Sequence, residues 1–546
     1  MALINRMRLR ADGYIEVYSR FDDRFISLVK GIDNTRWDRN LRAWLVPMFG
    51  LEDMLTWDIL NDKERDAIKM MIDKILSTDI DINVPALNNG FKYYPYQVEA
   101  LKFISKLPNS ILSLDMGLGK TLISQAHAYN LLNSDKVDKV LIYCPATLKW
   151  NWAGEIDKFF GNRMSYVVID GHFNKRKELW NEDTDIYITN YDLLIRNDYE
   201  VMEMITKDYK VLIIADEVTR IKNWKAKRTV NMKKLRPFYR LGLTGLPLEN
   251  HLSELYNIVD WLGMSRSMFG YYSQFRQKYM ITDEYGNVVE YINLSDINRK
   301  IKYVMYRKKK EDVLPDLPGK IINNYYIELT ESELADYHFI EDMLNSVLAK
   351  IDEFGIKKVY NEVLAWMTLS RMFCDYPELI RMSDSESANK IKPYVRTTKH
   401  TKLSELMNLL NNELEDRKVV IFTQFSRMAD VIYDMIKDRH VYLLSGKVKN
   451  RQDVIDTFNN DDSNAIFIST DAGAYGVNLQ SASYMINYDL PFNPAVLEQR
   501  IARLHRIGQK EVVNVVNMIV KHEELVEKRV EEILGNKYKM IQEVIE

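Results

Sequence analysis

A lysine and a threonine follow a glycine-rich turn near residue 120, a combination typical of a phosphate site. The segment Leu112-Ser-Leu-Asp-Met-Gly-Leu-Gly-Lys-Thr121 reads as a short apolar strand, a turn and the start of a helix. Backbone N–H groups converge in such a turn, and a helix N-terminus favours negative charge. Lys120 is then expected to reach the β- and γ-phosphates of a nucleotide, and the Thr121 hydroxyl to bind Mg²⁺. The residues expected to line the phosphates are Met116, Gly117, Leu118 and Gly119.

The strict form of this motif has a glycine five positions before the second one, and this chain has Leu114 there. A chance Gly-Lys-Thr at a strand–helix turn is therefore an alternative interpretation. The other motifs of the chain are needed to distinguish a phosphate site from a chance match.

A pair of carboxylates provides the second piece of chemistry. Val211–Ala215 is a continuous apolar run typical of a buried central strand, and Asp216 and Glu217 follow it directly. Ligands bind outside the carboxyl ends of the strands in open α/β sheets. Asp216 is expected to hold Mg²⁺ through water, and Glu217 to orient and deprotonate the attacking water. Together with Lys120, this pair predicts phosphoryl transfer from ATP.

Alternating strands and helices are predicted to position these groups. Apolar, β-branched runs alternate with helical stretches in both halves of the chain, which favours an α/β fold with two tandem parallel sheets. The expected strands are Val140–Tyr143, Tyr166–Ile169, Ile186–Thr189, Val211–Ala215 and Leu241–Leu243, then Val419–Phe422, Tyr442–Leu444, Ile466–Ile468, Met485–Tyr488 and Val513–Val516. The second sheet has no phosphate-binding turn of its own.

The predicted domain order starts with a small, aromatic-rich α+β module over residues 1–80 and a linker over 81–93. A first lobe over 94–320 binds ATP and carries a mostly helical insertion at about 262–310. The second lobe covers 321–546. Its predicted parts are a helical insertion at about 330–382, a flexible loop at 383–400 and a charged C-terminal helix at 522–546.

Composition limits the other possibilities. Hydrophobic and charged residues make up 46% and 28% of the 546 residues, which is ordinary for a globular protein. Two cysteines, Cys144 and Cys374, cannot form a disulfide framework or a zinc cluster. No signal peptide or membrane span is expected. The net charge of −3 leaves any nucleic-acid contact to local basic runs, such as Lys222–Arg236 and Arg299–Lys310. A solvated face is the alternative for each run.

An ordered set of motifs runs through the chain. They are Gln97, Asp115-Met-Gly-Leu-Gly-Lys-Thr121, Asp216-Glu-Val-Thr219, Leu243-Thr-Gly-Leu-Pro-Leu-Glu-Asn250, Ser469-Thr-Asp-Ala-Gly-Ala-Tyr-Gly-Val-Asn-Leu479 and Gln499-Arg-Ile-Ala-Arg-Leu-His-Arg-Ile-Gly-Gln509. From residue 90 to about 535 the chain resembles the Swi/Snf-type branch of the superfamily-two helicase-like ATPases. Tyr306-Arg-Lys-Lys-Lys-Glu-Asp-Val-Leu-Pro-Asp-Leu-Pro318 resembles a signature of that branch. The resemblance implies two RecA-like lobes that close on ATP, with duplex DNA across both.

The resemblance also implies roles for single residues. Gln97 would read adenine, and Thr244 and Gly245 would couple lobe closure to hydrolysis. Arg503 and Arg506 would be arginine fingers, with Gln499 helping at the cleft. A cation supplied by a closing lobe neutralises phosphoryl charge and can be worth roughly 10³–10⁵ in rate. A solvated basic helix face is the alternative for the two arginines.

DNA contacts follow from the resemblance in the same way. The expected residues are Lys149, Trp150, Thr189, Asn190, Lys222, Asn223, Thr423, Gln424 and Gly446. Hydroxyls, amides and lysines suit phosphate contacts, which carry no sequence information. Binding is therefore expected to be independent of DNA sequence and sensitive to salt.

The N-terminal module has its own resemblance. Tyr18-Ser-Arg-Phe-Asp-Asp-Arg-Phe-Ile-Ser-Leu-Val-Lys30, Trp37-Asp38 and Trp44-Leu-Val-Pro47 resemble the HARP substrate-recognition domain of annealing helicases. That domain implies forked DNA as a partner. Exposed aromatics could stack on unpaired bases, whereas core packing explains most aromatic residues in a module of this size.

The leading hypothesis is a DNA-dependent ATPase that uses ATP and Mg²⁺, translocates on double-stranded DNA, and remodels forked or branched DNA or displaces bound protein. A strand-separating helicase and a non-catalytic, ATP-gated DNA-binding scaffold are the alternatives. The chain is expected to act as a monomer in the cytoplasm of a bacterial or phage-infected cell, with a replication or repair protein as a further partner.

Overall fold

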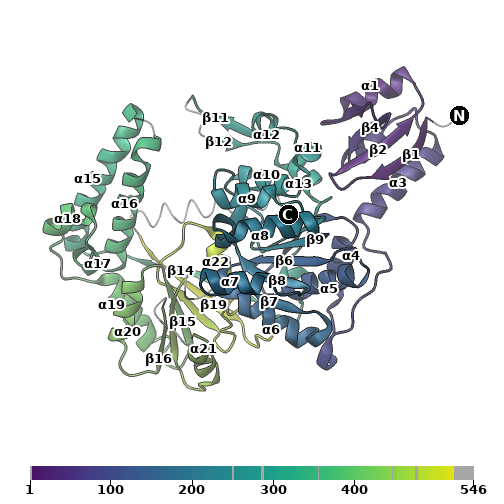
Figure 1. Cartoon of the computed structure of the whole chain (residues 1–546). Coiled ribbons are helices and arrows are strands. Elements are labelled where there is room, and N and C mark those ends of the chain that lie inside the picture. The colour runs from purple at the N-terminus through teal and green to yellow at the C-terminus, as the bar shows by residue number, and fades with distance from the viewer. Residues whose placement is uncertain are drawn as a thin grey trace. The chain divides into compact units, whose positions relative to one another are not determined.

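The computed structural model describes residues 3–248, 251–284, 288–354, 356–445, 448, 451–471, 473 and 477–521 (Figure 1). It divides into two compact units between Leu314 and Pro315. This division lies inside the Tyr306–Pro318 signature, a few residues before the predicted boundary at residue 320. The predicted helix at 522–546 lies outside the described residues.

The first unit opens with an antiparallel sheet in the order β1-β2-β4-β3 (Figure 1). Its strands are β1 (Ile4–Leu9), β2 (Tyr14–Ser19), β3 (Arg36–Asp38) and β4 (Ala43–Pro47), and its helices are α1 (Asp23–Gly31), α2 (Gly50–Leu55) and α3 (Asp62–Leu76). Helix α3 begins where the Asn61 side chain accepts from the Glu64 N–H and the Glu64 carboxylate accepts from the Asn61 N–H. This capping box fixes the start of the helix.

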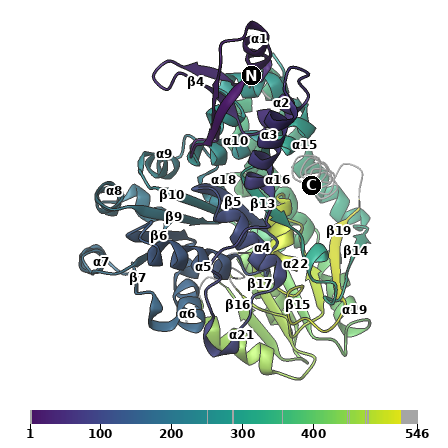
Figure 2. The same cartoon turned by 90° about the vertical axis from the view of Figure 1, so that its right-hand side faces the viewer.

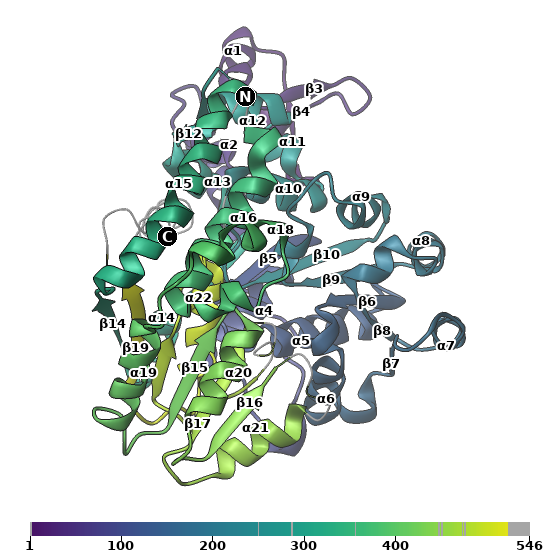
Figure 3. The ribbon, with the colours of Figure 1, turned by 90° about the vertical axis from the view of Figure 1, so that its left-hand side faces the viewer.

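A parallel sheet in the order β13-β5-β10-β9-β6-β8-β7 forms the body of the first unit (Figure 3). Its strands are β5 (Asn109–Leu114), β6 (Lys139–Cys144), β7 (Tyr166–Val168), β8 (Ile186–Asn190), β9 (Val211–Asp216), β10 (Tyr239–Thr244) and β13 (Met305–Lys308). Its longer helices are α4 (Pro95–Ile104), α5 (Lys120–Asn133), α6 (Lys149–Phe159), α7 (Phe173–Trp180), α8 (Asp198–Asp208), α9 (Lys227–Lys234) and α10 (Leu252–Trp261).

Helices cover both faces of this sheet because successive strand residues point to opposite sides. Leu212 and Ile214 pack with α4, α5 and α6 in one apolar cluster. Val211 and Ile213 pack with α7, α8, α9 and α10 in another cluster. Cys144 ends β6 as a buried free thiol.

The second unit contains a parallel sheet in the order β14-β19-β18-β15-β17-β16 (Figure 2). Its strands are β14 (Lys320–Ile327), β15 (Val419–Thr423), β16 (Val441–Leu444), β17 (Ile466–Thr470), β18 (Tyr484–Asn487) and β19 (Val513–Val520). Its helices are α15 (Glu331–Phe354), α16 (Ile356–Asp375), α17 (Glu378–Arg381), α18 (Glu386–Ile391), α19 (Thr401–Asn411), α20 (Ser426–Met435), α21 (Arg451–Asn460) and α22 (Pro494–Ile501). The expected α/β class with two parallel sheets is confirmed.

Two predicted irregular regions are more ordered than the sequence suggests. The insertion at 262–310 contains helices, but also the hairpin of β11 (Met280–Thr282) and β12 (Val288–Tyr291), and its basic end forms strand β13 of the main sheet. Within 383–400, predicted as a flexible loop, α18 begins where the Ser385 side chain accepts from the Ala388 N–H. The Asp336 carboxylate, from α15, accepts the N–H groups that follow α18, which fixes the rest of the segment.

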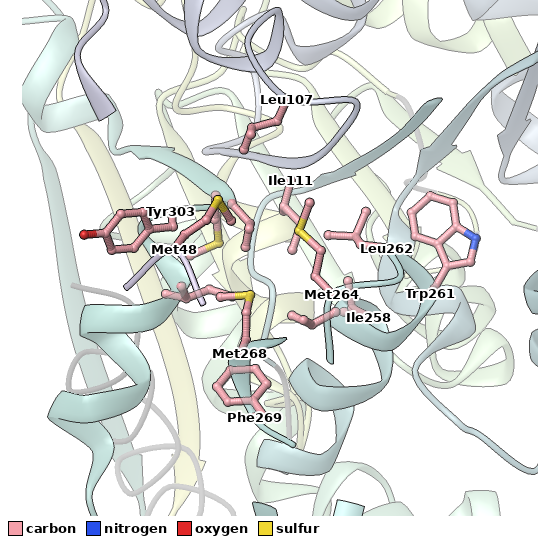
Figure 4. Packing of buried hydrophobic residues seen from close by; sticks show 14 of the residues in the cluster. Met48, Leu107, Ile111, Ile258, Trp261, Leu262, Met264, Met268, Phe269 and Tyr303 are labelled. Carbon is pink, nitrogen blue, oxygen red and sulfur yellow. The ribbon is translucent and has the colours of Figure 1, made fainter. Parts of the chain in front are cut away.

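The N-terminal module shares its apolar core with the body of the first unit. Met48 lies in one cluster with Met264, Met268 and Tyr303 (Figure 4). Gly13 has a φ of +78°, and a Cβ there would lie 2.6 Å from the Ser267 Oγ. Glycine therefore permits the close approach of the two parts.

Ion pairs surround this apolar contact. The carboxylates of Asp33 and Asp53 pair with basic residues on or next to α13 (Leu294–Ile301). The Lys300 ammonium is buried, lies 3.0 Å from the Asp296 carboxylate, and sits over the Phe49 ring at 4.5 Å. The module is thus fastened by both apolar and charged contacts.

Candidate ATP-binding site

The turn between β5 and α5 has the backbone conformation of a phosphate cradle. Gly117 and Gly119 have φ values of +86° and +80°, and α5 begins at Lys120 as predicted. A Cβ at Gly119 would lie 2.5 Å from the Gln97 Nε2. Left-handed backbone and a close neighbour both require glycine at this position.

Lys120 is held inside this turn. Its Nζ donates to the carbonyl oxygens of Leu114 at 2.7 Å and Asp115 at 3.4 Å. Burial lowers the pKa of the Lys120 ammonium, and the charges of Glu217 and Asp216 oppose that shift. A cation therefore lies where the converging N–H groups would receive phosphate oxygens.

Register places the predicted catalytic groups at adjacent strand ends. Strand β10 lies between β5 and β9, with Thr244 opposite Ser113 and Leu243 opposite Asp216. The cradle, Thr244 and the acidic pair therefore share the carboxyl edge of the sheet, where α/β proteins bind ligands.

Asp216 is a buried carboxylate with a defined partner. The Trp152 Nε1 donates to its Oδ2 at 3.0 Å, and the Tyr191 hydroxyl donates to its backbone carbonyl at 2.7 Å. Burial raises the pKa of Asp216, while the Trp152 hydrogen bond and the Lys120 charge lower it. The hydrogen bond thus favours the ionised form that a metal ligand needs.

Glu217 has left-handed backbone, with φ of 51° and ψ of 59°. Such a conformation costs a non-glycine residue of the order of 1–3 kcal/mol and is concentrated at functional sites. The strain ends β9 abruptly and gives Glu217 a side-chain direction that a continuing strand would not allow.

These residues fit the donor set of a nucleotide-bound Mg²⁺. The ion usually takes one or two carboxylates, substrate phosphates and several waters rather than a full protein cage. Thr121 supplies a hydroxyl at the first turn of α5, and Asp216 supplies a carboxylate. Among the described residues, no cluster of three or more His, Cys, Asp or Glu suited to a metal occurs.

Two expected nucleotide contacts are engaged in holding the backbone. The Gln97 amide is buried: its Oε1 accepts from the Tyr94 N–H, and its Nε2 donates to the Leu118 carbonyl. The Thr244 hydroxyl bonds to both the N–H and the carbonyl of Leu246. Both side chains therefore shape the cradle and its neighbouring turn, and Gly245 follows in that turn.

In the second unit, Gln499 lies half-buried on α22. Arg503 and Arg506 come after this helix ends at Ile501, in a half-buried turn. They do not form the solvated helix face that was the alternative interpretation.

Sequence reasoning missed Arg500, the neighbour of Gln499. Only 2% of Arg500 is exposed, and its guanidinium pairs with Asp471 at 2.5 Å and Asp489 at 3.5 Å. It also donates to the Asn487 side chain and the Asp489 carbonyl. Arg500 thus anchors the segment that carries the predicted arginine fingers, and only its place inside the Gln499–Gln509 motif could have indicated this.

The predicted DNA contacts of the first unit differ in their exposure to solvent. Trp150 is 63% exposed, as a contact residue should be. Lys149 is only 4% exposed, and its Nζ bonds to the Ile169 carbonyl and the Asp170 carboxylate, each at 2.8 Å. The buried, paired ammonium of Lys149 thus positions α6, and a DNA contact there stays a prediction.

The other predicted contacts also have internal partners. Thr189 is fully buried, and the Asn190 side chain accepts from the Asp192 N–H. Lys222 pairs with Glu254 at 3.3 Å, and the Asn223 side chain accepts from the Lys225 N–H. These groups shape the loops at the strand ends. Trp224, which the sequence reasoning passed over, is 61% exposed beside them.

In the second unit, the buried Thr423 hydroxyl donates to the Asp489 carboxylate at 2.6 Å. The Gln424 backbone N–H donates to the same carboxylate, and its side-chain oxygen accepts from Arg371. The Thr423 side chain is thus engaged inside the second unit, and its DNA contact stays a prediction. Gly446 lies outside the described residues.

Comparison with known proteins agrees with this geometry. A family model described as the SNF2-related domain matches residues 96–379. The chain belongs to the SNF2-related family. A second model, the helicase conserved C-terminal domain, matches residues 401–508. Within the described part of the chain, none of the helices combines the length and apolar character that a bilayer crossing requires.

Several relatives are similar over most of this SNF2-related chain. TATA-binding protein-associated factor MOT1 of Saccharomyces cerevisiae is 28% identical over 95% of the chain, which spans 30% of that protein. An uncharacterized ATP-dependent helicase of Mycoplasma genitalium is 27% identical over 99% of the chain, which spans 51% of that protein. The uncharacterized ATP-dependent helicase YqhH of Bacillus subtilis is 27% identical over 85% of the chain, which spans 81% of it. The Sulfolobus solfataricus SWI2/SNF2 ATPase core in complex with dsDNA aligns with 25% identity over 85% of this chain and 95% of that one, at a TM-score of 0.40.

Proposed function

We propose that this chain is a DNA-dependent ATPase that uses ATP and Mg²⁺ and moves along double-stranded DNA. One observation carries the proposal: Lys120 follows β5, and Asp216 and Glu217 lie at the end of β9 on the same edge of the sheet, with only β10 between these strands, in an SNF2-related chain. That arrangement supports phosphoryl transfer, because a cradle, a metal ligand and a base converge on one edge.

Each group has a role in this reaction. The turn amides and the Lys120 ammonium hold the phosphates, and the strained Glu217 accepts a proton from the attacking water. Bound Mg²⁺ would neutralise charge on the β- and γ-phosphates. Arg503 and Arg506 of the second unit would neutralise the charge that develops on the transferred phosphoryl group, which couples hydrolysis to domain motion.

Forked or branched DNA is the substrate we propose, because one face of the N-terminal sheet suits unpaired strands. Register places Arg8 beside Glu16, and Leu45 beside both Glu16 and Arg36, on the same face. On that face the Arg6 guanidinium lies 5.9 Å from the Tyr18 ring, and that of Arg36 lies 5.3 Å from the Tyr14 ring. Arginines bind phosphates, and their planes stack on bases. Tyr14 itself is buried, so the exposed arginines carry this face. This face supports forked DNA as the partner that the HARP-like resemblance implies.

The test is steady-state ATP hydrolysis by the full chain with no DNA, single strands, plain duplex and a model fork. Lys120→Ala serves as the blank. Stimulation by duplex that is strongest on the fork is the expected result. Hydrolysis in none of these conditions would refute the motor and leave the scaffold alternative.

A paired variant tests the fork preference. Arg8→Gln combined with Arg36→Gln should remove the extra stimulation by the fork while keeping that by duplex. Arg24→Gln is the matched control, because Arg24 is exposed on α1 and pairs with Asp58. Equal fork preference in both variants would exclude this face as the fork-reading surface.

A strand-separating helicase is the second candidate, because two relatives carry the printed name ATP-dependent helicase. Release of a labelled strand from the fork would favour it. Stimulation by duplex without strand release would favour the translocase.

A further inference from the structure

We infer that Arg307 is a positioning residue of the ATP site that neutralises Asp115, a carboxylate at the edge of the phosphate cradle. The inference rests on the proposed function and extends it to a residue outside the predicted nucleotide-binding set. Arg307 lies on β13, an edge strand that the sequence analysis did not recognise.

Arg307 contacts two parts of the site at once. One guanidinium nitrogen lies 2.9 Å from the Asp115 Oδ1, and another donates to the Gly245 carbonyl at 3.1 Å. The second carboxylate oxygen of Asp115 accepts from the Lys310 N–H at 3.0 Å. The strand register explains why the Arg307 side chain can contact Asp115, because Arg307 lies opposite Ser113, two residues before Asp115.

The charge of Asp115 makes this contact chemically necessary. Asp115 directly precedes the cradle turn, and its backbone carbonyl also accepts from the Lys120 ammonium. Its negative charge would repel a bound polyphosphate unless a cation cancels it. The Arg307 side chain is 14% exposed and that of Asp115 is 30% exposed, so solvent screens the pair only partly.

The bond to Gly245 adds a geometric function. Gly245 follows Thr244 in the turn after β10, so Arg307 joins that turn to the cradle across the ends of β5 and β10. A flexible lysine could keep the charge but not the planar fork that makes both contacts. The two functions can therefore be separated by choice of variant.

The experiment measures binding of a fluorescent ADP with Mg²⁺ to the full chain. Arg307→Gln should weaken binding roughly tenfold, because a single uncompensated charge beside a half-buried anion site has about that effect. Asp115→Asn combined with Arg307→Gln should bind within threefold of wild type, because the repulsive charge is gone. Arg307→Lys should bind nearly as well as wild type.

Lys308→Gln is the matched control, because Lys308 lies on the same strand with a half-exposed ammonium 3.8 Å from Glu99. Its affinity should stay at the wild-type value. Equal loss in Arg307→Gln and in the double variant would overturn the inference and indicate direct contact with the nucleotide or a purely structural role. Unchanged affinity in Arg307→Gln would also overturn it. No binding by the wild-type chain would instead refute the proposed function itself.

Discussion

The hydrogen bond from Trp152 to Asp216 makes a quantitative prediction about the pH dependence of hydrolysis. Trp152→Phe removes the donor that lies 3.0 Å from the Asp216 Oδ2 and keeps most of the apolar side chain. The bond stabilises the ionised carboxylate, because burial alone raises the pKa of Asp216. Its loss should therefore raise that pKa further.

The size of the effect follows from the burial of both groups. A hydrogen bond to a charged group is worth about 1.5–3 kcal/mol, and 1.36 kcal/mol corresponds to one pKa unit. The acid limb of kcat/KM should therefore move to higher pH by about one unit. Below this limb the variant should lose roughly tenfold in rate, with a smaller loss on the alkaline side.

The assay is DNA-stimulated ATP hydrolysis from pH 5 to 9, together with thermal unfolding. Trp180→Phe is the matched control, because the Trp180 Nε1 donates to the Asp198 carboxylate at the same distance of 3.0 Å, away from the ATP site. Both variants should lose similar stability. An acid limb that superimposes on wild type in Trp152→Phe would refute the reasoning.

Three further predictions concern stability. His127 is buried, and burial lowers its pKa from 6.5 to about 4, so protons bind the unfolded chain first as pH falls through this window. Stability should drop by up to about 3 kcal/mol on acidification from pH 6.5 to 4, and Gln at this position should flatten that drop in urea melts. Lys300→Met should destabilise the module contact by about 1 kcal/mol, because Asp296 loses its buried partner but keeps Lys278 and Arg299. The readout is faster proteolytic cleavage between the module and α4. Arg500→Gln should cost the second unit about 1–3 kcal/mol in guanidinium melts, because Asp471 loses its guanidinium partner while the buried Asp489 keeps Arg371.

Each of these predictions has a control residue of the same type in an exposed place. His440, Lys63 and Arg417 serve for His127, Lys300 and Arg500 respectively. Substitution of the control residues should leave stability within about 0.5 kcal/mol of wild type. Equal effects in a matched pair would contradict the burial argument for that pair.

Continuous apolar runs made the central strands predictable. Strands β9 and β15 are buried at every position, and their sequences contain the unbroken apolar runs Val211–Ala215 and Val419–Phe422. Edge strands lack this signal. In β14 most side chains are exposed, and β13 has the mixed sequence Met-Tyr-Arg-Lys, so neither was expected.

The Gly117–Thr121 turn and the Asp216–Glu217 pair could be predicted because each motif is short and local in the sequence. Their partners could not be predicted, since Trp152, Tyr191 and Arg307 come from other elements and meet the site only in the folded sheet. The same limit explains Lys149. A lysine that follows a strand suits a phosphate contact. Its sequence position does not indicate that the ammonium of Lys149 pairs with the Asp170 carboxylate in the folded chain.

The shared core around Met48 has a consequence for how the N-terminal module would sample DNA. A module on a flexible linker samples a volume that the linker length sets, and its effective concentration at the DNA falls as the linker lengthens. This module has no such freedom, because Met48 packs among side chains of the first unit (Figure 4). On a translocating chain the module would therefore keep a constant distance from the site of ATP hydrolysis. Its arginine-rich sheet face would contact the DNA a constant number of base pairs from that site.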